Sequence, residues 1–439
     1  MKSRKTAGED CDDNVLEWCL FSNDATQSNW MVEARADMSM ADDRLRGIVG
    51  FNYLSQNIDS TAVTPLFWDT ATSTYAGLGG DLLTFVFNDK QDLKSWALFS
   101  QWEYDLTNDL TIIGGVRYTH DKKEFDAYFA QAVLAAPMAL PRTLDDFLLL
   151  GDMVRAQSTP AEQTIFNTDT VGDLAIIDDG AINANAQINW TPTDDVLLYA
   201  SYRRGVKSGG FVTGNVGPAF PAATRPYGSE TNNAYEIGVK STIFDGLAIL
   251  NAAAFYYDYK DLQANSFIGL TNVITNNDTT VYGGEIELAA SPIDGLDFSL
   301  ALGLVDSDVQ DVTNAQGVTK DRELPLAPKY TFNATAKYET AAPFGIDGSV
   351  WVQGNVRTQG ARWRDALNNP SVQLEAFTLA NAQVGYRFPN ENVAVYAWMK
   401  NVFNSRHEVT TVDLHTLGNT GEVAYEAPQW WGVTLQLSY

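Results

Sequence analysis

The 439-residue chain has little positive charge. Its 29 Lys and Arg stand against 55 Asp and Glu, which gives a formal net charge of -26. Binding to nucleic acid needs a basic face, so this charge argues against that class of function. Acidic surface loops are the simplest source of the excess. The chain also has only 3 His and 2 Cys, which leaves few candidates for metal or nucleophilic chemistry.

Long apolar runs are absent as well. No stretch approaches the roughly 18 consecutive apolar residues that a membrane-spanning helix needs. The most apolar long segment, around residues 130–150, is interrupted by Pro137 and Pro141. The N-terminus begins with Met1 and Lys2 but no apolar stretch follows, so a secretory signal peptide is not recognisable. The lack of a long apolar run excludes a helical membrane protein.

Aromatic residues and glycine are abundant. The chain has 19 Tyr, 21 Phe, 11 Trp and 33 Gly, with a mean hydropathy of -0.18. Transmembrane β-barrels place aromatic side chains in girdles at both membrane surfaces, and their polar lumen keeps the mean hydropathy low. A membrane barrel is therefore compatible with this composition.

Several segments alternate between apolar and polar residues, as a strand does when its two faces meet different surroundings. The last segment shows the pattern best. One face carries Trp431, Val433, Leu435, Leu437 and Tyr439, and the other carries Gly432, Thr434, Gln436 and Ser438. Soluble sandwiches also alternate, so this pattern alone does not decide the fold.

The lengths of the connections decide it. We predict about fifteen strands, and the connections between them alternate between short and long. Short turns at one rim and long loops at the other are typical of an outer-membrane barrel with its turns in the periplasm. The predicted fold is an all-β, transmembrane antiparallel barrel. Turns are expected at 41–43, 106–109, 191–194, 244–247, 291–295 and 389–391. Strands are expected near 29–40, 44–55, 93–105, 110–121, 181–190, 195–207, 232–243, 248–262, 279–290, 296–305, 329–339, 346–357, 374–388, 392–402 and 430–439.

The strand count suggests an incomplete barrel. About fifteen strands would pair the first and last strands in parallel, whereas bacterial single-chain barrels have even strand numbers. We therefore expect one barrel domain over residues 29–439, preceded by a remnant of an extracellular loop at 1–28. The absent signal peptide points the same way.

Four segments, in order along the chain, resemble the TonB-dependent receptors of the Gram-negative outer membrane. LYASYRRGVKSGGF at 198–211 is similar to the family's YASYSRGFKSGGFN run, with Arg203 and Val206 as departures. YEIGVKS at 235–241 is similar to YELGLKS, and LPLAPKYTFN at 324–333 to LPNAPKWTFN. KNVFN at 400–404 is similar to the start of KNLFDKRY, and an aromatic-terminated strand follows it.

The resemblance implies active uptake of a scarce ligand, most often a ferric siderophore complex, powered by the TonB complex. In this family an N-terminal plug domain, which carries the TonB box, fills a barrel of about 22 strands. The resemblance also implies contact with outer-membrane lipid and lipopolysaccharide. Residues before 29 are too few for such a plug. The ligand is left open, as is the origin of the short chain: natural truncation, misplaced start codon or incomplete gene.

The motif residues are expected to be structural, and no catalytic residue, metal ligand or cofactor site is predicted. Gly209 and Gly210 are expected to permit a sharp loop, and Pro325 and Pro328 an extended entry into a strand. The resemblance assigns Tyr439 to the signal for barrel assembly. The full set of motif positions is Tyr199, Tyr202, Arg204, Gly205, Lys207, Ser208, Gly209, Gly210, Phe211, Glu236, Gly238, Pro325, Pro328, Asn401, Phe403 and Tyr439.

Other features support weaker hypotheses. Cys11 and Cys19 lie in the predicted extracellular segment, where a disulfide is plausible. His407 and His415, with Asp413 and Glu408, offer groups for a metal or haem, but in a mobile loop they are expected to be solvated instead. The segment 130–150 is expected to form a short helix or lid in the longest loop, at 122–180. Polar residues expected to face the lumen are Arg117, Glu285, Glu287, Arg357, Gln383 and Arg387.

Two other functions compete with a receptor. A passive porin-like channel would need a closed, even-numbered barrel with an inward constriction loop. A barrel enzyme would need a catalytic constellation at the rim, and none of the three histidines lies beside a promising serine. We therefore predict that the chain is not an enzyme, and keep the porin as the alternative.

Overall fold

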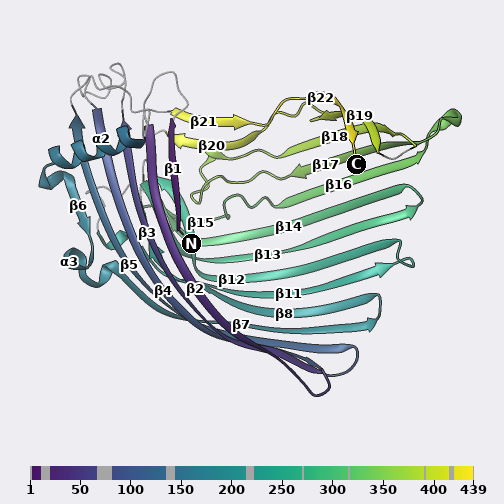
Figure 1. Cartoon of the computed structure of the whole chain (residues 1–439), viewed down its shortest axis with the longest axis horizontal. Coiled ribbons are helices and arrows are strands. Elements are labelled where there is room, and N and C mark those ends of the chain that lie inside the picture. Colours follow the sequence, from purple (N-terminus) through teal and green to yellow (C-terminus); the bar gives the residue numbers. More distant parts are fainter. Residues whose placement is uncertain are drawn as a thin grey trace.

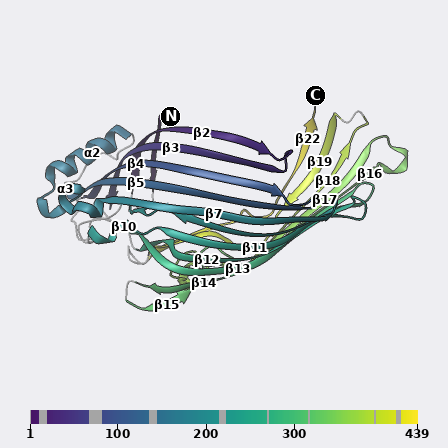
Figure 2. The same ribbon diagram turned by 90° about the horizontal axis from the view of Figure 1, so that it is seen from below.

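The computed structural model describes residues 2–10, 20–66, 82–134, 144–213, 222–268, 271–314, 317–389, 392–414 and 420–438. One large antiparallel sheet dominates it, with the helices gathered at one end (Figure 1). The sheet is strongly curved from β2 round to β22 (Figure 2). None of the helices among these residues is long and apolar enough to cross a membrane.

Of the 18 strands in this sheet, β6 (Gln163–Phe166) and β15 (Thr319–Arg322) are short additions to β5 and β14. The other sixteen follow one another in chain order, each antiparallel to the next. They are β1 (Lys2–Asp10), β2 (Leu20–Met40), β3 (Leu45–Leu66), β4 (Leu82–Asp105), β5 (Leu110–Leu134), β7 (Ile176–Thr193), β8 (Val196–Lys207), β11 (Glu230–Ile243), β12 (Ala248–Ile268), β13 (Thr271–Ile293), β14 (Leu296–Thr313), β16 (Tyr330–Ala341), β17 (Ser349–Gln359), β18 (Phe377–Arg387), β19 (Val393–Lys400) and β22 (Trp430–Leu437).

Smaller elements connect these strands. Two hairpins pair β9 (Gly210–Phe211) with β10 (Pro226–Tyr227), and β20 (Glu408–Leu414) with β21 (Thr420–Tyr425). The helices are α2 (Leu144–Gln157) and the single turn α3 (Thr168–Val171). Five 3-10 turns are η1 (Pro160–Glu162), η2 (Gly172–Ala175), η3 (Ala222–Thr224), η4 (Pro343–Gly345) and η5 (Pro370–Val372).

The strand count corrects one prediction. Among the described residues, sixteen strands rather than about fifteen form the ladder, so the argument from an odd strand number is wrong. The additional strand is β1, which pairs with β2 from Lys2↔Ser28 to Asp10↔Leu20, where a loop was expected. Its sequence, KSRKTAGED, has no apolar alternation, because ladder hydrogen bonds come from the backbone and do not require it. Among the described residues, β1 and β22 do not pair with each other.

Many strands are longer than predicted at the end opposite the short turns. β4 has 24 residues and β5 has 25, and they pair without interruption from Asp105↔Thr111 to Leu82↔Leu134. About 9 to 11 residues suffice to cross a membrane, so both strands extend well beyond it. In the extensions, apolar and polar residues do not alternate strictly, so the pattern used for prediction stops before the strands do.

The short turns lie together at the other end of the sheet, on the right in Figure 1. Ala41, Asp42 and Asp43 all have positive φ, of 57, 54 and 65°, and Arg44 N donates to Ala41 O at 3.2 Å. Phe244, Asp245 and Gly246 repeat the pattern. Asp and Gly tolerate this left-handed region better than most residues, so these predicted turns are confirmed. Of the turn expected at 389–391, residues 390 and 391 lie outside the described part.

The two faces of the sheet differ in polarity, as β22 shows. Trp431, Val433, Leu435 and Leu437 are between 63% and 73% exposed on one face. On the other face Thr434 Oγ1 accepts a hydrogen bond of 3.1 Å from Trp398 Nε1. An apolar face that stays exposed in a transmembrane barrel meets lipid, and the polar face lines the lumen. We call the polar face the inner wall.

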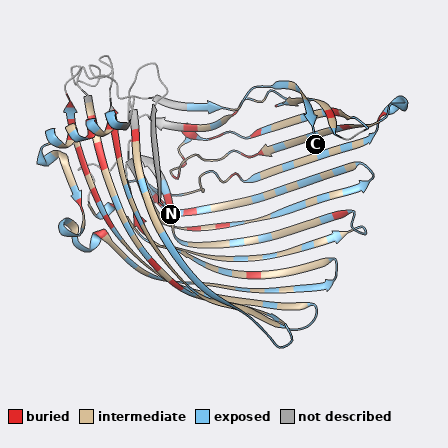
Figure 3. Cartoon of the chain, viewed as in Figure 1, coloured by how far each residue is buried: buried red, intermediate tan, exposed pale blue. Residues whose placement is uncertain are grey.

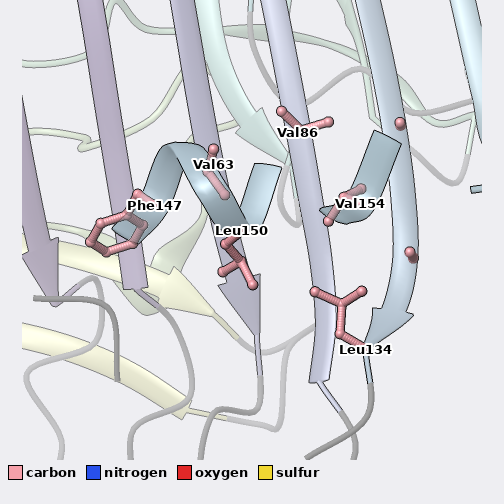
Figure 4. Close-up of a cluster of buried hydrophobic side chains, with 8 residues drawn as sticks. Val63, Val86, Leu134, Phe147, Leu150 and Val154 are labelled. Atoms are coloured by element: carbon pink, nitrogen blue, oxygen red, sulfur yellow. The ribbon is translucent and has the colours of Figure 1, made fainter. Parts of the chain in front are cut away.

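Buried residues concentrate at the end that carries the helices (Figure 3). There α2 packs across the apolar face of β3, β4 and β5 (Figure 4). The cluster comprises Val63, Val86, Ala130, Ala132, Leu134, Phe147, Leu150 and Val154. The helix expected in the longest loop therefore exists, although it begins at Leu144. It serves as a cover for the strand extensions.

Leu150 and Leu149 allow a matched test of this packing. Leu150 is 2% exposed in the cluster, whereas Leu149 is 61% exposed. Leu150→Ala should lower the local free energy of unfolding of α2 by about 2–5 kcal/mol, because a buried leucine leaves a cavity. Hydrogen exchange of the α2 amides should accelerate accordingly. Leu149→Ala should leave this exchange unchanged, and equal acceleration in both variants would contradict the packing.

Candidate functional site on the inner wall

The inner wall carries aromatic side chains on β8 and β12. Tyr199 on β8 donates to Glu236 Oε1 on β11 at 2.8 Å. Gly238 lies opposite Tyr199, and a Cβ there would come within 2.6 Å of the Tyr199 ring. The glycine therefore makes room for the aromatic side chain. Phe255 and Tyr257 on β12 stack with ring centroids 4.8 Å apart and planes at 19°.

Near the short turns, charges on the inner wall are paired. Arg387 Nε lies 3.3 Å and Lys337 Nζ 2.7 Å from the Glu339 carboxylate. Arg46 likewise lies 2.7 Å from Asp105. The six polar residues predicted to face the lumen all lie on this wall by strand register: Arg117, Glu285, Glu287, Arg357, Gln383 and Arg387.

The end of the sheet opposite the short turns is called the outer end here. At this end a small aromatic core orders the loops. Phe125 of β5 and Phe211 of β9 stack at 4.8 Å with planes only 8° apart. Phe166 of β6 contacts both rings, and the Arg225 guanidinium lies 5.1 Å above Phe166. All four side chains are buried. This core fixes the loop that leaves β8 against the top of β5.

The two motif glycines pack closely rather than turn sharply. Gly209 and Gly210 are not among the residues with positive φ. Instead, a Cβ on Gly209 would come within 2.5 Å of the Tyr227 carbonyl oxygen, and one on Gly210 would meet the Tyr227 ring. Close approach of two backbones is therefore the reason for glycine here. Lys123 Nζ donates to the Gly209 carbonyl, and burial lowers the pKa of this lysine.

Other motif residues hold neighbouring strands. Tyr202 Oη donates to Asn233 Oδ1 at 3.0 Å, and Arg204 reaches the same oxygen at 3.4 Å. Ser208 O accepts from Gln263 Nε2 at 3.1 Å. Between Pro325 and Pro328 the chain turns at Leu326, which has φ of 57° and donates its N–H to Trp363 O at 2.7 Å. Lys207 lies opposite Glu230 in the strand register, at the end of the β8–β11 ladder.

Asn401 closes the loop that follows β19. Its buried side chain donates to Ser405 O and Ala427 O, both at 2.9 Å, and accepts from Ser405 N at 2.8 Å. Asn401 also has a positive φ of 49°, which asparagine adopts more readily than most residues. Phe403 is 66% exposed and takes no part in these hydrogen bonds. Cys11, Cys19, His415 and Tyr439 lie outside the described residues.

The histidine prediction needs a correction at His407. This residue is 5% exposed and its ring stacks on Phe377 with centroids 3.9 Å apart, where a solvated loop residue was expected. Sequence reasoning also missed Phe125, Phe166 and Arg225. They come from three distant segments that meet at Phe166, which contacts Phe125, Arg225 and the motif residue Phe211.

Comparison with known proteins identifies what this architecture resembles. A family model described as "TonB dependent receptor-like, beta-barrel" matches residues 13–402. The pesticin receptor of Yersinia enterocolitica is 22% identical over 312 residues, and that of Yersinia pestis is 20% identical over the same length. Each match covers 71% of this chain but only 39% of the relative, so the chain spans well under half of their length.

Solved structures share the fold. The ferric yersiniabactin uptake receptor FyuA from Yersinia pestis superposes with a TM-score of 0.71 at 14% identity, covering 100% of this chain and 57% of that one. The ferric-catecholate import receptor Fiu from E. coli K12 gives 0.56 at 14% identity, covering 99% and 63%. The copper transporter OprC gives 0.55 at 13% identity, covering 100% and 71%.

The glycines of 198–211 provide a test of the loop geometry. Gly209→Ala should destabilise the β9–β10 pairing by about 1–3 kcal/mol, because the added methyl group meets a backbone oxygen. Hydrogen exchange at Phe211 and Tyr227 should become faster. Gly205→Ala is the control, since no atom lies within 4 Å of a Cβ there. Unchanged exchange in Gly209→Ala would show that the two backbones can separate without cost.

Proposed function

Because this chain belongs to the family of TonB-dependent receptor-like β-barrels, we propose that it forms the wall of an outer-membrane receptor for a scarce nutrient. The proposed nutrient is a ferric siderophore complex, and the proposed energy source is the TonB complex acting through a plug domain. Outer-membrane lipid and lipopolysaccharide would surround the wall. The family consists of receptors and transporters, so the prediction that the chain is not an enzyme is confirmed.

The single observation that carries this proposal is the two-faced wall. One face exposes apolar side chains such as Leu300, Leu302 and Leu304 on β14, as contact with lipid requires. The opposite face carries hydrogen-bonded polar groups and stacked aromatic rings, which suit a hydrated lumen. A wall of this kind supports passage of a polar solute through a membrane.

The extended outer end supports a large ligand. Strand extensions, the α2 cover and the core around Phe211 build an ordered rim well above the membrane-spanning part. A small ion would not need such a rim, whereas a bulky iron chelate would contact several elements at once. The names of the similar proteins include ferric yersiniabactin and ferric catecholates, and also copper. We favour a ferric chelate because two of these three proteins take one.

Adjacent tyrosines on β12 provide a test of ligand binding at the inner wall. Tyr257 lies on the inner wall, whereas Tyr256 lies on the apolar face and is 46% exposed. The purified chain, refolded in detergent micelles, should bind a ferric siderophore from a panel, measured by quenching of its 11 tryptophans. Tyr257→Ala should weaken binding on the order of tenfold through the lost aromatic contact. Tyr256→Ala should bind like the parent chain.

The alternative is a passive porin-like channel, and one further measurement separates the two. A receptor wall should bind ferric chelates more tightly than the iron-free siderophores. Failure to bind any ferric chelate, together with a stable open-channel conductance in planar bilayers, would support the porin instead. Copper ions are tested in the same titrations, and preference for copper would overturn the assignment of the ligand.

A further inference from the structure

A cluster of cationic side chains surrounds Phe377 at the outer end of β17 and β18. Phe377 is the first residue of β18 and pairs with Gln359, the last residue of β17. Strand register places Arg357 on the same face as Gln359, which is the inner wall. Arg362 follows in the connection between the two strands, where its backbone pairs with Leu374 at 3.0 and 2.9 Å.

Phe377 acts as a platform for these groups. The Arg357 and Arg362 guanidinium carbons lie 5.6 and 5.7 Å from its ring centroid, within the usual range of a cation–π contact. The His407 ring lies parallel to Phe377 at 3.9 Å. Two guanidinium groups and one imidazole therefore contact the same buried phenyl ring. These contacts restrict where the three groups can lie.

Polar atoms in this cluster lack partners. Arg362 Nη1 and His407 Nδ1 are both buried without a hydrogen bond within the part of the chain that the structure describes. His407 as a whole is only 5% exposed. A buried donor without an acceptor is costly, and such groups are rare in folded proteins unless a ligand, ion or water satisfies them.

The two arginines of the cluster also form no ion pair among the described residues. Arg46 and Arg387, near the short turns, each form an ion pair with a carboxylate, whereas Arg357 and Arg362 have none among the described residues. Within the described part of the chain, Arg357 donates only to the neutral Gln359 Oε1, at 3.2 Å. Burial lowers the pKa of Arg362, and the nearby Arg357 lowers it further. Burial lowers the pKa of His407, and the nearby carboxylates of Glu426 and Glu408 oppose this shift.

We propose that Arg357 and Arg362, supported by Phe377 and His407, form an anion-binding site that takes a carboxylate group of the transported ligand. The proposal rests on the receptor function above and names a chemical class for its ligand, a carboxylate-bearing chelate. Guanidinium groups bind carboxylates through paired, charge-assisted hydrogen bonds. The donors here are side chains beside aromatic rings, without the ring of backbone N–H groups that commonly encloses phosphate, and a flat carboxylate fits them better.

The test uses the refolded chain in detergent micelles and isothermal titration calorimetry with citrate alone, a tricarboxylate without iron. The parent chain should bind citrate, and the double variant Arg357→Gln/Arg362→Gln should bind it about tenfold to a hundredfold more weakly. The double variant Arg357→Lys/Arg362→Lys keeps the charge but loses the paired geometry, and it should recover only part of the affinity. Heat-modifiable migration on gels checks that each variant is folded.

Arg117→Gln is the matched control. Arg117 also lies on the inner wall, with its guanidinium carbon 5.6 Å above the Phe99 ring, but it donates to Thr119 at 3.0 Å and Asn52 at 3.2 Å. Its removal should leave citrate affinity unchanged. An equal loss in Arg117→Gln would mean that the lumen attracts anions without a defined site, and would overturn the proposal. Inorganic phosphate binding as tight as that of citrate would overturn the assignment to a carboxylate.

The outcome separates this site from the receptor function. If the parent chain binds citrate at Arg357 and Arg362 but no ferric chelate, the anion site stands and the receptor function fails. If ferric chelates bind equally well to the parent chain and to Arg357→Gln/Arg362→Gln, the receptor function stands and the proposed site fails.

Discussion

The antiparallel ladder imposes a period of two on every strand, and most properties of this molecule depend on that constraint. Successive side chains must point to opposite faces, so one register assigns each residue either to the apolar outer face or to the inner wall. On β12, Tyr256 and Tyr257 are neighbours in sequence but meet different surroundings. Backbone hydrogen bonds are satisfied between strands, which leaves the side chains free to serve two solvents at once.

Beyond the membrane-spanning part, the two faces of the ladder no longer meet different solvents. Small apolar cores organise the structure there. The α2 cover buries the apolar face of β3 to β5, and the Phe125–Phe166–Phe211 core holds the loop after β8. Both cores join segments that are distant along the chain. They hold α2 and the loop after β8 against the strand ends.

Charge is distributed unevenly along the inner wall. Near the short turns, Glu339 lies between Lys337 and Arg387, and Asp105 pairs with Arg46. At the outer end, Arg357 and Arg362 share Phe377 instead of a carboxylate. Paired charges stabilise the wall itself. An arginine without an ion pair at the outer end can instead replace its bound water by a ligand. The chain as a whole has a net charge of -26, but this part of the inner wall is locally cationic.

The sequence by itself determined the fold class, most strand positions and the gathering of the short turns at one end of the sheet. These depend on local pattern: alternation within one strand, and Asp, Gly or Pro between strands. It missed β1 and the strand extensions, because backbone pairing outside the membrane needs no apolar alternation. Only the tertiary structure decided why Gly209 is glycine and why His407 is buried. Each depends on a segment distant in the chain, Tyr227 or Phe377, whose approach no local pattern records.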